Sequence, residues 1–298
     1  MSDSTPLNAP SNVDDILPSA QLWTRLQAQA DYALQCGALQ PIATNAEFIE
    51  DCGVRFIVRV LANLARKARA KKKQARSAAE GKPFNPFLPY DPDLFVGNLS
   101  PTHLCLLNKY NVVDYHLLMV TREFETQDSW LNAKDFDAAW RCLSEIDGLV
   151  FYNGGALAGA SQRHKHLQLI PMATDEIPID AVLQFERLGL AHALPSLPFR
   201  HSAMAFAAAP GHQLLEAYHQ LLNAVGLEVQ GTHQTGAYNL LFTRRWMLVV
   251  PRSQESFQSI SVNSLGFAGS LFVRDKAQLE RLKAHGPMAV LKEVAVVR

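Results

Sequence analysis

The chain has 298 residues, and its 28 basic residues balance its 28 acidic residues. This length allows either one large domain or two closely packed ones. The balanced charge creates no overall field for nucleic acid or an anionic membrane, so an anionic ligand has to be held locally. No apolar run reaches the roughly 18 residues of a membrane-spanning helix, and the N-terminal residues do not resemble a signal peptide. We therefore expect a cytoplasmic protein that binds neither nucleic acid nor membranes.

Hydrophobic spacing predicts the elements of the first half of the chain. Residues 1–15 lack apolar periodicity and are expected to form a mobile leader. Seven of the eleven residues from Arg66 to Arg76 are basic, which indicates either a solvated segment or an electrostatic guide for a polyphosphate. A proline-rich connector is expected at residues 81–93. The expected regular elements are a helix over 19–37, a strand over 54–60, a hairpin of strands 102–108 and 115–121, and a helix over 134–145.

The second half shows the same kinds of pattern. Strands are expected on both sides of a glycine-rich loop, and the later chain predicts a strand, a helix and a hairpin. The hydrophobic strand that ends at residue 121 is similar to the one that ends at 251, which fits an internal duplication and chance similarity equally well. The expected elements are strands over 149–152 and 166–172, a strand over 199–208, a helix over 214–225, and a hairpin of 238–242 with 246–250.

Most cysteines and histidines carry no signal of chemistry. No C-x-x-C pair occurs, so the cysteines are expected to be reduced packing residues, and no metal site is expected. The histidines outside the motif described next lack partners for a metal cage and are expected to be surface residues or hydrogen-bonded core residues. The cysteines are Cys36, Cys52, Cys105 and Cys142, and these histidines are His103, His116, His192, His201, His212, His219 and His233.

Three polar side chains alternate along one predicted strand, namely His164, His166 and Gln168. In an extended chain every second side chain leaves the same face, so these three are expected to point together. Lys165 and Leu167 take the opposite face. Two imidazoles and an amide in one row, where a core is expected, indicate a functional site.

A run of small residues precedes this strand. Asn153 and two glycines are followed by Gly159, Ala160, Ser161 and Gln162. Backbone N–H groups in such a run approach a phosphate closely, because glycine and alanine leave room and glycine permits the necessary turns. An imidazole beside an anion cradle suggests nucleophilic attack on phosphorus.

Four separated sequence words carry a family resemblance and span about residues 50–275. The His-x-His-x-Gln strand resembles the transferase branch of the histidine-triad superfamily, in which glutamine replaces the third histidine. All four words together resemble the diadenosine tetraphosphate phosphorylases, also called ATP adenylyltransferases. The words are Asn85-Pro-Phe-Leu-Pro, Leu107-Asn-Lys-Tyr-Asn-Val-Val, Gly159-Ala-Ser-Gln-Arg-His-Lys-His-Leu-Gln and Asn263-Ser-Leu-Gly-Phe-Ala-Gly.

The resemblance implies an α+β fold like that of the histidine-triad proteins, with antiparallel or mixed sheets, flanking helices and two such halves in one chain. Residues 16–175 are expected to form the catalytic half, and residues 176–298 a second half that completes the site. The implied reaction passes through a covalent nucleotidyl-histidine with His166 as the nucleophile, since neutral imidazole forms a labile phosphoramidate. His164 is expected to orient the strand end, and Gln168 to hydrogen-bond the α-phosphate.

Further residues are expected to contact the substrate. Asn108 matches the position that holds the ribose in the superfamily, although turn capping explains an asparagine there as well. Arg59 is expected to line the nucleotide pocket, with strand packing as the alternative. The polar residues of the small-residue run are expected to donate hydrogen bonds to phosphates. Lys67, or another residue of the basic segment, is expected to steer the distal phosphates.

The implied activity is phosphorolysis of diadenosine tetraphosphate, in which the nucleophile expels ATP and inorganic phosphate then releases ADP. The leaving group is already anionic, so cations and hydrogen bonds matter more than a strong acid. A divalent cation, with Mg²⁺ as the first candidate, is expected to arrive with the polyphosphate, and no organic cofactor is expected. The partners are then the nucleotide and phosphate, and the oligomeric state stays open, a monomer included.

Three other readings remain. A sugar-1-phosphate uridylyltransferase shares the His-x-His-x-Gln core, but Lys165 stands where that family usually has proline, and its cysteine pair is missing. A dinucleoside polyphosphate hydrolase is disfavoured by Gln168 in place of histidine. A catalytically silent sensor of nucleotide alarmones is disfavoured by His166.

Overall fold

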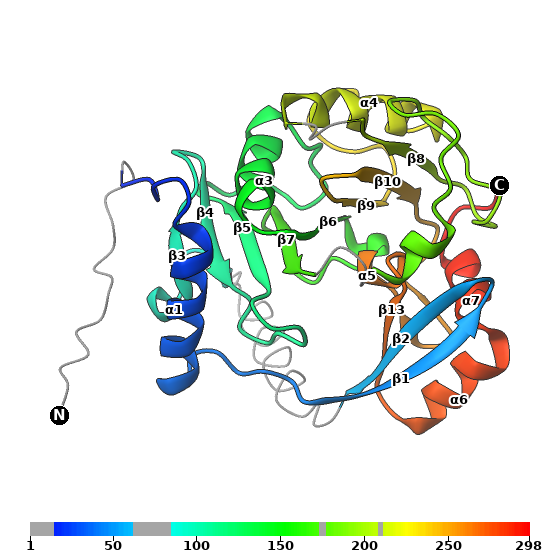
Figure 1. The fold of residues 1–298 in the computed structure, drawn as a ribbon, viewed down its shortest axis with the longest axis horizontal. Coiled ribbons are helices and arrows are strands. Elements are labelled where there is room, and N and C mark those ends of the chain that lie inside the picture. The colour runs from blue at the N-terminus through cyan, green and yellow to red at the C-terminus, as the bar shows by residue number, and fades with distance from the viewer. Residues whose placement is uncertain (1–14, 62–84, 173–176, 208–210) are drawn as a thin grey trace, which may run out of the picture.

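The computed structural model describes residues 15–61, 85–172, 177–207 and 211–298. Residues 1–14 of the predicted leader and the whole basic segment lie outside these ranges. The fold is a mixed α+β arrangement dominated by antiparallel sheets with flanking helices (Figure 1). The largest sheet has eight strands in the order β3-β4-β5-β7-β6-β9-β10-β8, and a second sheet has the order β1-β2-β13.

The first half of the chain supplies two helices and seven strands among the described residues. The predicted helices, the first strand, the hairpin and the two strands around the glycine loop are confirmed within a few residues. Two strands were missed, β1 and β3. The elements are α1 Leu22–Gln35, β1 Thr44–Asp51, β2 Val54–Leu61, β3 Phe95–Asn98, β4 His103–Leu107, β5 Leu117–Thr121, α3 Ala133–Glu145, β6 Gly148–Gly154 and β7 His166–Pro171.

The second half begins with a strand, a helix and a hairpin, as predicted. The remaining elements lie beyond residue 251, where the sequence analysis made no prediction. The helix α5 is a single turn whose first backbone groups are capped by the side chain of Asn263. The elements are β8 Ser202–Ala205, α4 Leu214–Ala224, β9 Tyr238–Phe242, β10 Trp246–Pro251, β11 Ser256–Phe257, β12 Ile260–Ser261, α5 Ser264–Phe267, β13 Ser270–Val273, α6 Lys276–His285 and α7 Pro287–Val294.

Strand pairing joins the early and late parts of the chain. In the large sheet β6 pairs antiparallel with β9, from Val150 opposite Phe242 to Gly154 opposite Tyr238. In the small sheet β2 pairs in parallel with β13, which places segments from both ends of the chain side by side (Figure 1). The division into halves at residues 175 and 176 stays a prediction.

The large sheet buries both of its faces. On one face α1, α3 and α4 contribute to a core that contains Leu167 and Leu169 of β7. The other face carries a second core with Phe151 and Leu241, and a small third cluster around Phe87. Because β7 contributes its leucines to the helix-covered face, its polar residues at alternate positions point to the opposite face.

Two further predictions concern composition. Within the described ranges, no helix is long and apolar enough to cross a bilayer. Cys105 and Cys142 are buried, as expected for packing residues, whereas Cys36 and Cys52 are exposed. The packing role predicted for all four cysteines is therefore wrong for two of them, because one follows the C-terminal end of α1 and the other lies in the tight turn between β1 and β2.

Candidate active site

The side chain of His166 is held by its own strand. Its Nδ1 lies 2.8 Å from the carbonyl oxygen of His164. A carbonyl oxygen only accepts hydrogen bonds, so Nδ1 carries the proton and Nε2 carries the lone pair. Within the described part of the chain Nε2 has no hydrogen-bond partner. The ring thus presents a nucleophilic nitrogen.

His164 is anchored at both ring nitrogens. Its Nε2 lies 2.8 Å from the carbonyl oxygen of Thr121 and 3.1 Å from that of Glu123, so Nε2 donates. Nδ1 then accepts from the side-chain amide of Asn85 at 3.0 Å. The ring of Phe87 contacts both motif histidines, with centroid distances of 5.7 and 5.3 Å. His164 therefore has no lone pair left for attack and fixes the start of the strand.

Gln168 is oriented by a chain of two side chains. The N–H of Tyr110 donates to Asn108 Oδ1 at 3.3 Å, so the amide nitrogen of Asn108 faces His116 Nδ1 at 3.2 Å. Nδ1 of His116 accepts this bond, and its Nε2 donates to Gln168 Oε1 at 3.0 Å. This polarity leaves the NH₂ group of Gln168 as a donor.

The glycine-rich loop joins β6 to β7 and lies at the end of the sheet that carries the histidines. Gly155 and Gly159 have positive φ angles of 91° and 87°. A Cβ atom on Gly159 would lie 2.8 Å from the carbonyl oxygen of Val262. Glycine is required there by both the backbone conformation and the close approach of the neighbouring segment.

A buried polar cluster ties this loop to the second half of the chain. Asn153 Oδ1 accepts hydrogen bonds from Asn239 Nδ2 and the backbone N–H of Ser264, both at 2.9 Å. Asn239 also donates to the carbonyl oxygen of Ala158 at 2.8 Å and accepts from Arg252 at 2.6 Å. The cluster explains why the fourth sequence word, which includes Ser264, accompanies the motif.

Lys165 is fully buried on the face opposite the two histidines. Its Nζ contacts Asp135 Oδ2 at 2.7 Å and Glu125 Oε2 at 3.0 Å. Asp135 also accepts from His103 Nε2 at 3.0 Å.

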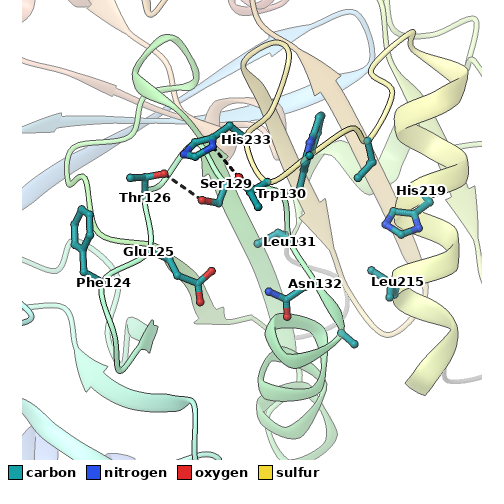
Figure 2. Close-up of a pocket in the computed structure, with 14 residues that line it drawn as sticks. Phe124, Glu125, Thr126, Ser129, Trp130, Leu131, Asn132, Leu215, His219 and His233 are labelled. Atoms are coloured by element: carbon teal, nitrogen blue, oxygen red, sulfur yellow. Dashed lines mark hydrogen bonds between the residues drawn. The ribbon is translucent and has the colours of Figure 1, made fainter.

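Glu125 lines a pocket of about 570 Å³ between the loop that precedes α3, the helix α4 and residues 229–233 (Figure 2). None of the three motif residues lines this pocket, but the ring of Phe124, which does, packs against His164 with a centroid distance of 5.4 Å.

Two family models match almost the whole chain. Residues 12–185 match the Ap4A phosphorylase N-terminal domain, where Ap4A is diadenosine tetraphosphate. Residues 195–297 match the ATP adenylyltransferase C-terminal domain. The first match alone covers more than half of the chain. The chain belongs to the Ap4A phosphorylase family.

Relatives in this family come from Saccharomyces cerevisiae. Diadenosine 5',5'''-P1,P4-tetraphosphate phosphorylase 2 is 32% identical over 249 residues, which cover 72% of this chain and 76% of that protein. Protein APA1 is 29% identical over 211 residues, or 61% of this chain and 64% of that protein. The structure of yeast Ap4A phosphorylase Apa2 in complex with Ap4A has a TM-score of 0.76 and 27% identity, with 94% and 98% of the two chains covered.

The structure brings together most of the residues expected to act in an Ap4A phosphorylase. His164, His166 and Gln168 share one face, and Asn108 reaches Gln168 through His116. The turn-capping role of Asn108 is present too, because its oxygen accepts from Tyr110. Asn153, Gly159, Ala160, Ser161 and Gln162 end or follow β6 at the same end of the sheet. Their roles as phosphate ligands stay predictions.

Two predicted ligand residues stand apart from this group. Arg59 lies on β2 in the three-stranded sheet, and its Nε is buried with no hydrogen-bond partner among the described residues. Its place in the nucleotide pocket of an Ap4A phosphorylase stays a prediction. Lys67 lies outside the described residues, and so does the rest of the basic segment.

Sequence reasoning missed three residues of the site, Asn85, Phe87 and His116. Asn85 and Phe87 belong to one of the four sequence words of the family, but the word by itself assigns no role to either residue. The interpretation of His116 as a hydrogen-bonded core residue is correct but incomplete, because its partner is Gln168, 52 residues away. The position of His116 at the end of the hairpin turn, next to β5, was the available signal.

If the covalent nucleotidyl-histidine expected from the family resemblance forms on His166, the pH dependence of its formation, called adduct formation below, should report the environment of this side chain. Burial, which is the largest effect, lowers the pKa of its imidazole to about 4. The ring is therefore neutral at pH 7, and it becomes protonated only as the pH falls through about 4. We expect the single-turnover rate of nucleotidylation to be flat from pH 8 to about pH 5. Rapid-quench measurements of this rate across the pH range test the prediction. A fall in the rate with a midpoint near pH 6.5 would contradict it.

Replacing His116 with phenylalanine should lower turnover by about tenfold, because Gln168 loses the donor that fixes the direction of its amide. The effect is expected in kcat rather than in KM, as the substrate contacts remain. Steady-state kinetics on purified protein measure both constants. His192, which bonds the carbonyl oxygen of Arg187 away from the motif, provides the matched control as His192→Phe. Equal kcat values for the native and His116→Phe proteins would contradict the orienting role.

Proposed function

We propose that this protein phosphorolyses Ap4A to ADP and ATP through an adenylyl group on His166. The observation that carries the proposal is the state of this ring, in which Nδ1 donates to the carbonyl oxygen of His164 and Nε2 keeps its lone pair. The similarity to yeast diadenosine tetraphosphate phosphorylase 2 and to the structure of yeast Apa2 in complex with Ap4A supports the choice of substrate.

The reaction follows from this arrangement in two displacements. Nε2 of His166 attacks an α-phosphorus of Ap4A, the N–P bond forms, and the bond to the bridging oxygen breaks to release ATP. The imidazolium that results is stabilised by the hydrogen bond from Nδ1 to the backbone. An oxygen of inorganic phosphate then attacks the same phosphorus, the N–P bond breaks, and ADP leaves with the ring neutral again.

The charge on the transferring group needs donors. The NH₂ group of Gln168 is assigned as the donor to an α-phosphate oxygen, because its Oε1 is already engaged by His116, and such donors typically contribute a factor of about 10² to 10³ to the rate. The glycine-rich loop offers backbone N–H groups. The buried Nε of Arg59 favours a role as a ligand of the nucleotide. Lys67 keeps its proposed role in guiding the distal phosphates.

A divalent cation is proposed to enter with the polyphosphate. Among the described residues there is no group of three or more His, Cys, Asp or Glu side chains arranged to hold a metal ion. Mg²⁺ prefers few protein ligands and substrate phosphates, which fits this arrangement. We further propose that the protein acts in the cytoplasm and needs no organic cofactor.

The test is to incubate the purified protein with Ap4A and Mg²⁺, with and without inorganic phosphate, and to separate the nucleotides by anion exchange. Equal amounts of ADP and ATP that appear only with phosphate are expected. AMP with ATP, or ADP alone, in the absence of phosphate would instead identify a hydrolase. Without any turnover, uridine diphosphate sugars become the next substrates to test, and binding without turnover would identify a sensor.

A further inference from the structure

A glutamine side chain lies between the two strands that lead to the site. Gln127 is buried, and its Oε1 accepts the backbone N–H of His166 at 2.8 Å. Its Nε2 lies 3.1 Å from the carbonyl oxygen of His166 and 3.1 Å from that of Asn153. One amide therefore satisfies both backbone groups of the nucleophile and the carbonyl oxygen of Asn153, one residue before the end of β6.

The strand register shows what this amide replaces. β6 and β7 are paired from Gly148 opposite Pro171 to Phe151 opposite Gln168. Continuing this register would place Asn153 opposite His166. The ladder ends before that position, and the Gln127 amide occupies the gap with the hydrogen bonds that a neighbouring strand would make. One amide group thus separates the end of β6, where the loop starts, from the first residue of β7, which is the nucleophile His166.

The backbone around Gln127 is itself fixed. Its N–H donates to the carbonyl oxygen of Arg163 at 2.8 Å, and its carbonyl oxygen accepts from the hydroxyl of Tyr152 at 2.6 Å. The hydroxyls of the flanking Thr126 and Ser129 bond each other at 3.1 Å (Figure 2). A side chain on such a segment has little freedom, so the position of its amide is well defined.

We propose that Gln127 is a positioning residue that sets the separation between the nucleophile and the glycine-rich loop. His166 comes from β7 and the loop from β6, so the spacing of these strands determines how a phosphate in the loop meets Nε2. Errors of about 1 Å in such geometry cost about 100-fold in rate. The inference rests on the proposed function, in which His166 is the nucleophile.

The first variant is Gln127→Met, which keeps the length of the side chain and leaves three backbone groups without their partner. We expect the single-turnover rate of adduct formation with Ap4A to fall about 100-fold, while the Kd for AMP changes less than about threefold. The amide of His166 should also exchange its hydrogen faster than in the native protein. Intact-protein mass spectrometry after rapid quench measures the adduct.

The second variant is Gln127→Glu. A carboxylate keeps the acceptor for the His166 N–H but loses both donors, and it faces two carbonyl oxygens. Protonation restores one donor. The rate of this variant relative to the native protein, measured where circular dichroism shows both to be fully folded at every pH, should therefore rise as the pH falls from 8 to 6.

Gln278 supplies the matched control. It is buried to a similar extent, accepts from the backbone N–H of Arg274 at 2.8 Å and donates to the carbonyl oxygen of Ser259 at 2.7 Å, in the part of the chain around α6. Gln278→Met should lose comparable stability and keep the native rate of adduct formation.

The outcomes separate this inference from the proposed function. A native protein that forms no adduct overturns both. A native protein that forms the adduct, with Gln127→Met within threefold of its rate, overturns the positioning role alone. Equal slowing in Gln127→Met and Gln278→Met also overturns it, because the effect is then general destabilisation. Slowing and faster exchange confined to Gln127→Met support it.

Discussion

Replacing His166 with asparagine is expected to eliminate the covalent adduct and to lower phosphorolysis by at least about 10⁴-fold. Asparagine fits the space and stays polar, but its amide nitrogen has no lone pair available for attack on phosphorus. Binding of Ap4A should persist within about tenfold, because the loop and the donors around Gln168 are unchanged. Adduct formation is measured by mass spectrometry, and binding by isothermal titration calorimetry.

His201 provides a close control for this prediction. It is buried, its Nδ1 bonds the carbonyl oxygen of Phe199 two residues earlier at 2.8 Å, and burial lowers its pKa as well. Its Nε2 differs, because it accepts the backbone N–H of Leu194 at 2.8 Å. His201→Asn should lower stability and leave the adduct intact. Turnover that survives in His166→Asn at more than a hundredth of the native rate would show that another group is the nucleophile.

Replacing Lys165 with methionine is expected to lower the free energy of unfolding by about 3–5 kcal/mol, because the buried carboxylate of Asp135 loses its cation. Lys165 and Asp135 are both fully buried, and Nζ also donates to the carbonyl oxygen of Trp130 at 2.9 Å. Denaturant unfolding measures the change. The exposed pair of Arg55 and Glu50 gives the control as Arg55→Met, which should cost less than about 1 kcal/mol.

A double-mutant cycle separates pairing from packing. Lys165→Met with Asp135→Asn should cost less than the sum of the single changes, because the second removes the charge that the first leaves unpaired. Strict additivity would contradict the ion pair. Burial raises the pKa of Asp135, but the hydrogen bond from His103 and the charge of Lys165 outweigh it and lower the pKa overall. The contribution of the ionised Asp135 carboxylate to the free energy of unfolding is thus present above about pH 4 and is lost as the pH falls through the pKa of Asp135 in the folded protein.

The elements that are specified by residues close together in the sequence were predictable from the sequence. The β9–β10 hairpin was placed within one residue, since two nearly continuous apolar runs separated by a short turn specify it locally. β1 was missed because seven of its eight residues are polar or exposed, so that it lacks the apolar alternation of a buried strand. The elements after residue 251 are short, with no helix longer than 10 residues and no strand longer than 4, so each carries only a weak periodic signal.

The residues of the site likewise divide into those whose arrangement follows from nearby sequence and those brought together only by the fold. His166 and Gln168 lie on β7 and His164 lies two residues before it, so their common direction follows from the period of two. Gln127 reaches His166 from 39 residues away, and no periodicity connects the two. Lys165 is equally instructive, because its direction was predicted correctly, whereas the carboxylate that makes its burial tolerable comes from the first turn of α3. Long-range polar partners require the folded chain.

The pairing of β6 with β9 has a consequence for synthesis on the ribosome. β6 is complete at residue 154, but its partner, residues 238–242, is made more than 80 residues later. Until then the nascent chain holds β6, whose seven residues are all buried in the finished protein, at an open edge of the sheet. An unprotected apolar edge pairs readily with other chains. We therefore expect the nascent chain to be most prone to aggregation in the interval before β9 emerges.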